Sequence, residues 1–137
     1  MIDIRTITFV DCADHYRQAL FWSEVTGYQE DPNDPNHPDD PESRIVTPYG
    51  VSILFMPPPD GVEPAQVLAA NTVKNRMHLD LIPTERSRDE EVTRLLSIGA
   101  RLVADHRKSD GTGWVVLADP EDNEFCVERS AKERGLA

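Results

Sequence analysis

Apolar and polar residues alternate along residues 4–10, and this period of two predicts a β-strand. Asp14 is suited to cap a helix that reaches about Thr26, and Gly27 is suited to the left-handed position that ends it. Short strands are expected near 28–30, 43–48 and 51–56. The first half of the chain therefore predicts the order β-α-β-β-β.

The second half of the chain predicts the same order. Residues 76–82 alternate as a strand, and Ser87 with Glu90 forms a capping box ahead of a helix that ends before Gly99. Strands then fit near 101–104, 113–118 and 124–129. A single helix on one face of each small sheet is an α+β arrangement.

A weak internal repeat at an offset of 72 residues relates the two halves. Gly27 falls on Gly99 and Pro48 on Pro120, and apolar strand positions coincide as well. We therefore expect one domain built from two modules. Its predicted parts are the whole domain 1–137, a first module 1–57, a linker 58–75 and a second module 76–130.

Composition excludes several classes of function. The 137 residues include 25 acidic and 14 basic side chains, a formal net charge of −11, which argues against a nucleic-acid partner. No apolar run of about 18 residues and no basic-then-apolar leader occurs, so we expect no membrane partner and a cytoplasmic location. Two cysteines without a CxxC motif predict neither a disulfide framework nor redox chemistry.

Proline recurs every third residue within 31–42, at positions 32, 35, 38 and 41. This period matches polyproline II and predicts an extended, solvated loop. Repeated proline and like charge also predict that it is the least ordered internal segment. The loop is acidic, but it lacks the glycine and bidentate glutamate of an EF-hand calcium site.

Three strings of the second half resemble a known family: Arg76–Leu81, Leu96–Ala100 and Asp119–Val127. Together with Phe21 and Trp22 on the first helix, they resemble a glyoxalase-like protein of the vicinal oxygen chelate superfamily. That superfamily includes glyoxalase I, bleomycin-resistance proteins and extradiol dioxygenases. The resemblance implies two β-α-β-β-β modules that form a curved mixed sheet around a central cleft.

The resemblance also bears on metal binding. Metal-dependent members take one ligand from the first strand and one from the last strand of each module, positions that here hold His78, Cys126, Thr6 and Leu54. Leucine cannot ligate a metal, threonine is a poor ligand, and a firmly held divalent ion usually has three or four good protein ligands. We therefore expect no full metal site and no cofactor.

Alternation places a set of side chains on the sheet face opposite each helix. In the second module Met77, Leu79 and Leu81 are expected to face the helix, so His78 and Asp80 face away. Their separation along a strand, about 6.6 Å, favours a bridging ligand or water over direct contact. His78 and Asp80 are the candidate catalytic residues. The candidate ligand-binding residues are Thr6, Thr8, Ser52, Leu54, Met56, Trp114, Glu124 and Cys126.

Each of these residues also has a structural interpretation. His78 can be a hydrogen-bonded sheet histidine, and Trp114 can pack in the core. Another departure is Asp122, where the family's turn often has glycine. Aspartate tolerates a left-handed conformation, so the turn is expected to form.

Three functions remain open at this point. The first is a metal-independent lyase or isomerase in which His78, with Asp80, moves a proton on a small oxygenated substrate. The second is a protein that sequesters an aromatic or drug-like ligand. The third is a structural or regulatory homodimer with an inert pocket. A module of about 70 residues with one helix shields only one sheet face, so the other face needs a second module, either within this chain or from a second copy. Because closed two-fold symmetry is the usual arrangement, a homodimer is expected.

Overall fold

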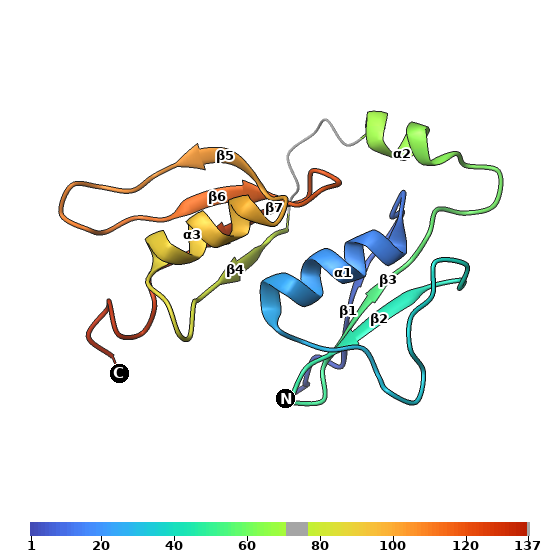
Figure 1. Ribbon diagram of the computed structural model, residues 1–137, viewed down its shortest axis with the longest axis horizontal. Coiled ribbons are helices and arrows are strands. Elements are labelled where there is room, and N and C mark those ends of the chain that lie inside the picture. The colour runs from blue at the N-terminus through green and yellow to red at the C-terminus, as the bar shows by residue number, and fades with distance from the viewer. Residues whose placement is uncertain (71–76, 137) are drawn as a thin grey trace. The chain divides into compact units, whose positions relative to one another are not determined.

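The computed structural model describes residues 1–70 and 77–136, which belong to two compact units, Met1–Thr72 and Val73–Ala137 (Figure 1). Each unit has its own sheet and its own covering helix, which confirms the α+β class and the two modules. The elements are β1 (Thr6–Phe9), α1 (His15–Thr26), β2 (Ser43–Val46), β3 (Ser52–Phe55), α2 (Pro64–Ala70), β4 (Leu79–Leu81), α3 (Arg88–Ser97), β5 (Arg101–Asp105), β6 (Val115–Ala118) and β7 (Glu124–Val127).

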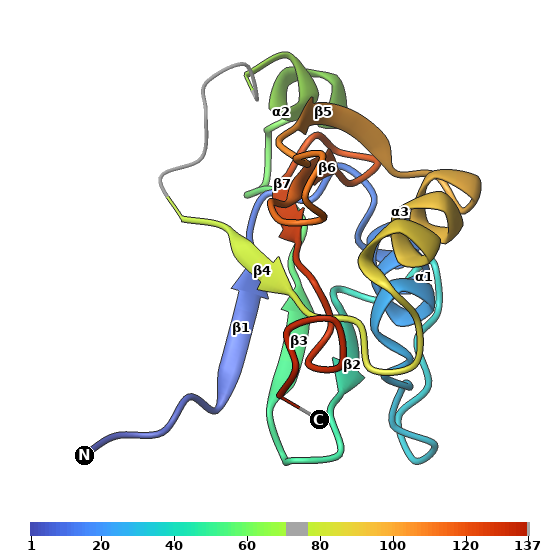
Figure 2. The same cartoon turned by 90° about the vertical axis from the view of Figure 1, so that its left-hand side faces the viewer.

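The first unit is a three-stranded sheet in the order β1-β3-β2, visible in Figure 2. The α1 helix starts at the predicted cap, where the Asp14 carboxylate accepts from the Arg17 amide, and it ends at Gly27 with φ 76°. Trp22 of α1 packs edge-on against Phe9 of β1, whose ring also contacts Phe55, and both Trp22 and Phe55 are fully buried. Burial of each such side chain stabilises the fold by about 1.5–3 kcal/mol.

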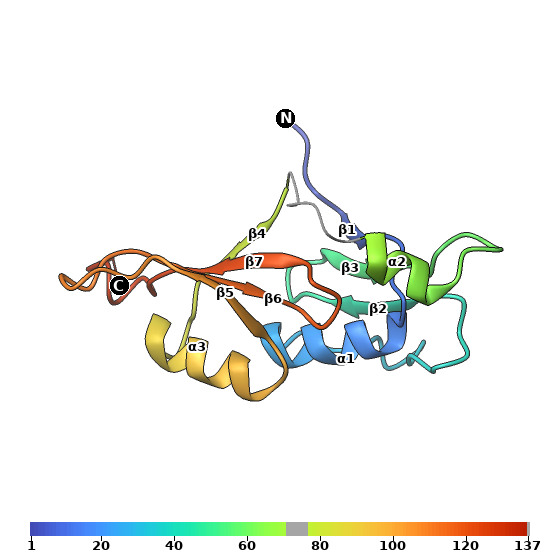
Figure 3. The ribbon, with the colours of Figure 1, turned by 90° about the horizontal axis from the view of Figure 1, so that it is seen from above.

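The second unit is a four-stranded sheet in the order β4-β7-β6-β5, with α3 along one face (Figure 3). The capping box of α3 is confirmed, because Ser87 and Glu90 exchange side-chain-to-backbone hydrogen bonds. Leu95 of α3 is buried, as are Leu117 and Phe125 of the sheet. The predicted turn before β7 is also present, with Asp122 left-handed at φ 65°.

Strand register supports the internal repeat. β1 pairs in parallel with β3, Thr6 opposite Ser52, and β4 pairs in parallel with β7, Leu79 opposite Phe125. Both pairings join residues 46 positions apart. The first and last strands of each unit are therefore neighbours in the same relative register.

The predicted boundaries differ from the observed ones in three places. The strand expected at 28–30 is a single bridge from Gln29 to Val46. The segment expected as a linker contains α2, whose first residue, Pro64, already has the φ angle of a helix. Met77 is exposed rather than packed on α3, because β4 begins only at Leu79. Position 76 of the predicted strand lies outside the described residues.

The acidic loop 31–42 is not the extended run that its prolines predict. Turns interrupt it, with the amide of Asp34 donating to the Asp31 carbonyl and that of Asp40 to the His37 carbonyl. The Asn36 side chain then donates to the Arg44 carbonyl at 2.7 Å and accepts from its amide at 2.8 Å. An asparagine amide thus pairs with β2 as a strand backbone would. The relative order of this loop stays a prediction.

No helix in the described part of the chain is long and apolar enough to cross a membrane.

Candidate functional site

A cavity of about 380 Å³ lies in the second unit, on its sheet and beside the hairpin between β5 and β6. Five of the predicted site residues line it: His78, Asp80, Trp114, Glu124 and Cys126. The other four lining residues are not among the predicted site residues: His106, Val116, Phe125 and Glu128.

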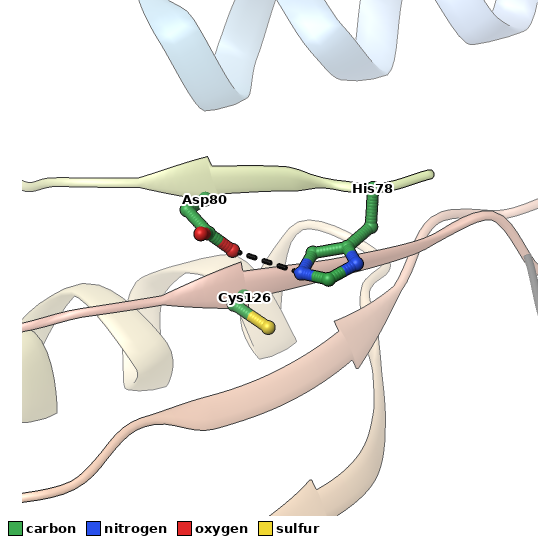
Figure 4. A group of neighbouring side chains, drawn as sticks. All are labelled: His78, Asp80 and Cys126. Atoms are coloured by element: carbon green, nitrogen blue, oxygen red, sulfur yellow. Dashed lines mark ion pairs between the residues drawn. The ribbon is translucent and has the colours of Figure 1, made fainter. Parts of the chain in front are cut away.

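Strand register explains how the polar end of this cavity is built. Asp80 of β4 lies directly opposite Cys126 of β7 in the parallel pair. His78 precedes Asp80 by two positions and so shares its side of the sheet (Figure 4). One ligand-type atom from each of the three side chains lies within 4.8 Å of the others. Cys126 is buried, whereas His78 and Asp80 are exposed.

His78 and Asp80 contact each other directly. Nε2 of His78 lies 3.1 Å from Oδ1 of Asp80, with side-chain exposures of 44% and 53%. The expectation of a bridging ligand or water is therefore wrong, because the two flexible side chains lean together and close the strand spacing. The contact favours the proton on Nε2 and leaves Nδ1 as an acceptor when the ring is neutral.

An aromatic wall bounds another part of the cavity. The rings of His106 and Trp114 lie 4.9 Å apart at their centroids, with planes 32° apart. His106 follows β5 and Trp114 precedes β6, and the His106 amide donates to the Trp114 carbonyl at 2.9 Å. The hairpin backbone pairs these two positions, and it pairs Lys108 with Thr112 two residues nearer its tip, a register that the turn residues 110–113 alone do not specify.

A buried arginine holds this hairpin to the start of α3. Nη1 of Arg88 donates to the carbonyls of Gly111, Thr112 and Gly113 at 3.2, 3.0 and 2.8 Å. Its Nε donates to Asp89 at 2.9 Å, and the residue is only 3% exposed. Because the tether ends one residue before Trp114, Arg88 fixes the segment that carries the aromatic wall.

Glycine is required at position 113. Its φ is 92°, and a Cβ there would clash with the backbone carbonyl of His106. The two strands of the hairpin can therefore approach closely only with glycine at this position. This approach brings His106 and Trp114 side by side.

Ion pairs strengthen the outer side of the hairpin. Arg107 donates to Asp105 at 2.6 Å and also to Asp89. The hydrogen bonds that Arg107 donates lower the pKa of Asp105 to about 2, and the same bonds, accepted by the Asp105 carboxylate, raise the pKa of Arg107. The hydrogen bond from Arg88 is the largest cause that lowers the pKa of Asp89, and the hydrogen bond from Arg107 lowers it further. These carboxylates are ionised at neutral pH and do not supply an acid to the cavity.

The five remaining predicted residues lie in the first unit and do not line this cavity. Thr6 and Thr8 are on β1, Ser52 and Leu54 are on β3, and Met56 follows β3. The predicted alternation is present, since Ile53 and Phe55 between them are buried.

The donor set for a metal differs from the sequence-based count. Leu54 and Thr6 supply nothing useful from the first unit. In the second unit, however, Asp80 joins His78 and Cys126 as a third donor. Nitrogen, carboxylate oxygen and thiolate sulfur are all ligands of Zn²⁺, so these three residues fit a divalent ion.

Comparison with known families decides the relationship. The family model described as a glyoxalase-like domain matches residues 7–128. The chain belongs to this family. A comparison with curated proteins finds no match.

Solved structures share the fold of this glyoxalase-like chain. A glyoxalase/bleomycin resistance protein/dioxygenase family enzyme from Burkholderia phytofirmans PsJN has a TM-score of 0.62 at 22% identity, covering 92% of this chain and 97% of that one. A glyoxalase-related enzyme from Fulvimarina pelagi has a TM-score of 0.59 at 19% identity, with 93% and 88% covered.

A third similar structure is a variant of the fosfomycin resistance protein FosX from Listeria monocytogenes, complexed with Mn(II) and 1S,2S-dihydroxypropylphosphonic acid. Its TM-score is 0.64 at 16% identity, with 98% of this chain and 96% of that chain covered. At such identities the similarity concerns the fold, that of the vicinal oxygen chelate superfamily.

Proposed function

We propose that this glyoxalase-like protein binds a small, planar, oxygenated aromatic molecule in the cavity of its second unit. The observation that carries the proposal is the pairing of two surfaces within one cavity. The rings of His106 and Trp114 offer a stacking wall, and the His78–Asp80 pair offers hydrogen-bonding groups.

Stacking and hydrogen bonding select for different parts of such a ligand. An aromatic ring packed on Trp114 gains dispersion energy and buries apolar surface. A favourable arrangement of the two rings adds about 0.5–1.5 kcal/mol to the binding free energy. A hydroxyl or carbonyl oxygen can meet His78. Because Asp80 fixes the ring through Nε2, the free Nδ1 accepts a hydrogen bond from a ligand hydroxyl.

The same pair can carry out a proton transfer in a lyase or isomerase. Nδ1 of His78 would take a proton from the substrate, and Asp80 would stabilise the resulting imidazolium through the Nε2 hydrogen bond. The proton would then return from Nδ1 to another substrate atom within hydrogen-bond reach, about 2.6–3.2 Å. If the ligand binds without such a proton transfer, the protein sequesters the ligand and does not convert it.

Catechol is a suitable first probe, because it is planar and carries two hydroxyls. With metal removed by a chelator, we expect catechol to quench the fluorescence of Trp114 saturably. Trp114→Ala should abolish the saturable signal, and His78→Ala should weaken binding. Tyr49→Ala is the matched control, because this exposed aromatic residue belongs to the first unit. No saturable binding of catechol or of a panel of hydroxylated aromatics would contradict the proposal.

We also propose that the chain forms a homodimer. Leu54 and Met56 lie half-buried on or beside the sheet face opposite α1, where a second copy could cover them. Sedimentation equilibrium at micromolar concentration tests this assembly. A single species at 15.4 kDa would contradict it without affecting the cavity.

A further inference from the structure

We propose that His78, Asp80 and Cys126 form a divalent cation site that is complete within the second unit and prefers Zn²⁺. This inference deepens the proposed function, because the site lies at the polar end of the same cavity. Asp80 takes the place of the donors that Thr6 and Leu54 do not provide. The expectation of no full metal site counted only His78 and Cys126, and the observed position of Asp80 adds a third candidate donor.

The backbone itself brings the three donors together. Asp80 and Cys126 are register partners on adjacent parallel strands, and His78 lies one pleat repeat before Asp80. Nε2 of His78 is 3.1 Å from Oδ1 of Asp80. Two ligands of one tetrahedral ion with bonds of 2.0–2.1 Å lie about 3.3 Å apart. A metal ion can therefore replace the proton that the two side chains share.

Only a modest side-chain adjustment would bring the three donors to a common ion. The three donor atoms already lie within 4.8 Å of one another, and the two exposed side chains are free of core packing that would prevent rotation. The buried thiol sits on β7 and fixes one corner of the site. His78 and Asp80 can move toward it by rotation about their side-chain bonds.

The donor types set the preference among metals. A thiolate with an imidazole and a carboxylate favours Zn²⁺ over the harder Mg²⁺ and Ca²⁺. Thiolate and carboxylate together balance the charge of a divalent ion. Glu124 and Glu128 line the same cavity and add a negative potential that attracts cations.

Three protein donors leave a coordination position open. His78 and Asp80 are exposed and line the cavity, so an ion held by them would be accessible to a molecule in that cavity. Open positions of this kind distinguish zinc sites that bind ligands from closed structural sites. The equivalent positions of the first unit, Thr6, Thr8 and Leu54, offer no comparable set.

Cobalt(II) titration of the chelator-treated full-length chain tests the site directly. We expect one equivalent to give the near-ultraviolet thiolate-to-cobalt absorption band and visible bands of a four-coordinate ion, both lost on addition of Zn²⁺. Cys126→Ser should remove the thiolate band. His78→Gln and Asp80→Asn should each weaken cobalt binding by about tenfold or more.

Cys12→Ser is the matched control, because Cys12 is the other buried thiol and its sulfur lies 3.3 Å from the Phe9 carbonyl in the first unit. This variant should keep the spectrum. If serine at 126 unfolds the chain, Cys126→Ala keeps the packing and replaces it. Absence of a stoichiometric thiolate band, its loss in Cys12→Ser, or unchanged affinity in Asp80→Asn would overturn the three-donor site.

The outcome is separable from that of the proposed function. Catechol binding to the chelator-treated protein tests the aromatic wall without metal, and cobalt absorption tests the donor cluster without catechol. Catechol binding with no cobalt site would leave the proposed function standing alone. A cobalt site with no catechol binding would support the cation site and reject the proposed ligand class.

Discussion

The two units place different chemistry on equivalent positions of one backbone plan. In the second unit, Asp80 of the first strand is the register partner of Cys126 of the last. In the first unit the corresponding pair is Thr8 and Leu54. Register and pleat decide where side chains point, and only residue identity decides what they can do there.

The use of tryptophan differs between the units in the same way. Trp22 of the first unit is 1% exposed and packs edge-on against Phe9 and Phe21. Trp114 of the second unit is 43% exposed and lines the cavity beside His106. The first unit packs its tryptophan in the core, whereas the second unit, whose core includes Phe125 beside aliphatic residues, leaves its tryptophan partly exposed in the cavity.

The sharpest way to test this contrast is to remove each tryptophan. Trp22→Ala should lower the free energy of unfolding by about 3–5 kcal/mol, because it empties a buried site. Trp114→Ala should change it by about 1 kcal/mol or less. Urea denaturation measures both values. Equal losses would show that Trp114 is a core residue.

Arg88 has no counterpart with the same role among the buried residues described in the first unit. Arg88→Met should destabilise the chain by about 2–4 kcal/mol, because three carbonyls lose a charged donor. The rate of backbone amide hydrogen exchange in the 106–114 hairpin should also rise in this variant. Arg101→Met is the control, since the exposed Arg101–Asp122 ion pair is worth under about 1 kcal/mol. Unaltered hairpin exchange in Arg88→Met would contradict the tether.

Gly113 and Gly111 offer a matched pair for the close approach in the hairpin. Both have positive φ, but only at position 113 would a Cβ meet the backbone of His106. Gly111→Ala should lower the free energy of unfolding by about 1 kcal/mol, because alanine is strained at positive φ. Gly113→Ala should lower it by about 1–3 kcal/mol more, because its Cβ would also clash with the His106 backbone. Thermal unfolding of the two variants provides the comparison. If both variants unfold at one temperature, the close approach is not constrained.

The smallest predicted effect concerns the dependence of stability on pH in the acidic range. The pKa of Asp105 is about 2 in the folded chain, below its unfolded value of about 3.9, so its stabilising contribution is present above pH 4. That contribution is lost as the pH falls through the folded pKa. Arg107→Gln should flatten the change in melting temperature between about pH 4 and pH 2. A pH profile identical to that of the unaltered chain would exclude this pair as a contributor.

Local signals in the sequence predicted much of the fold. Alternation located most strands, and the caps at Asp14 and Ser87 located the starts of α1 and α3 because capping depends on residues within one turn. The internal repeat predicted that each unit's first and last strands are equivalent. These features depend on period, turn chemistry and short-range hydrogen bonds.

The remaining features depend on contacts that a pattern does not encode. Arg88 reaches carbonyls more than twenty positions away, and Asn36 pairs with the backbone of Arg44 across a loop. The direct contact of His78 with Asp80 depends on side-chain rotation, which strand spacing does not fix. The sequence around His106 is typical of a solvated hairpin, because the charged residues Arg107 and Lys108 follow it before the turn. Its place beside Trp114 follows only from the hairpin pairing.

The parallel pairing of β4 with β7 has a consequence for the order in which this chain acquires its chemistry. Asp80 emerges from the ribosome well before Cys126, and their strands can pair only after the intervening 45 residues have been synthesised. Contacts of such sequence separation also form slowly because a long loop must close first. A nascent chain that ends before β7 has no donor cluster. The cluster of His78, Asp80 and Cys126 can therefore form only after β7 has been synthesised and has paired with β4.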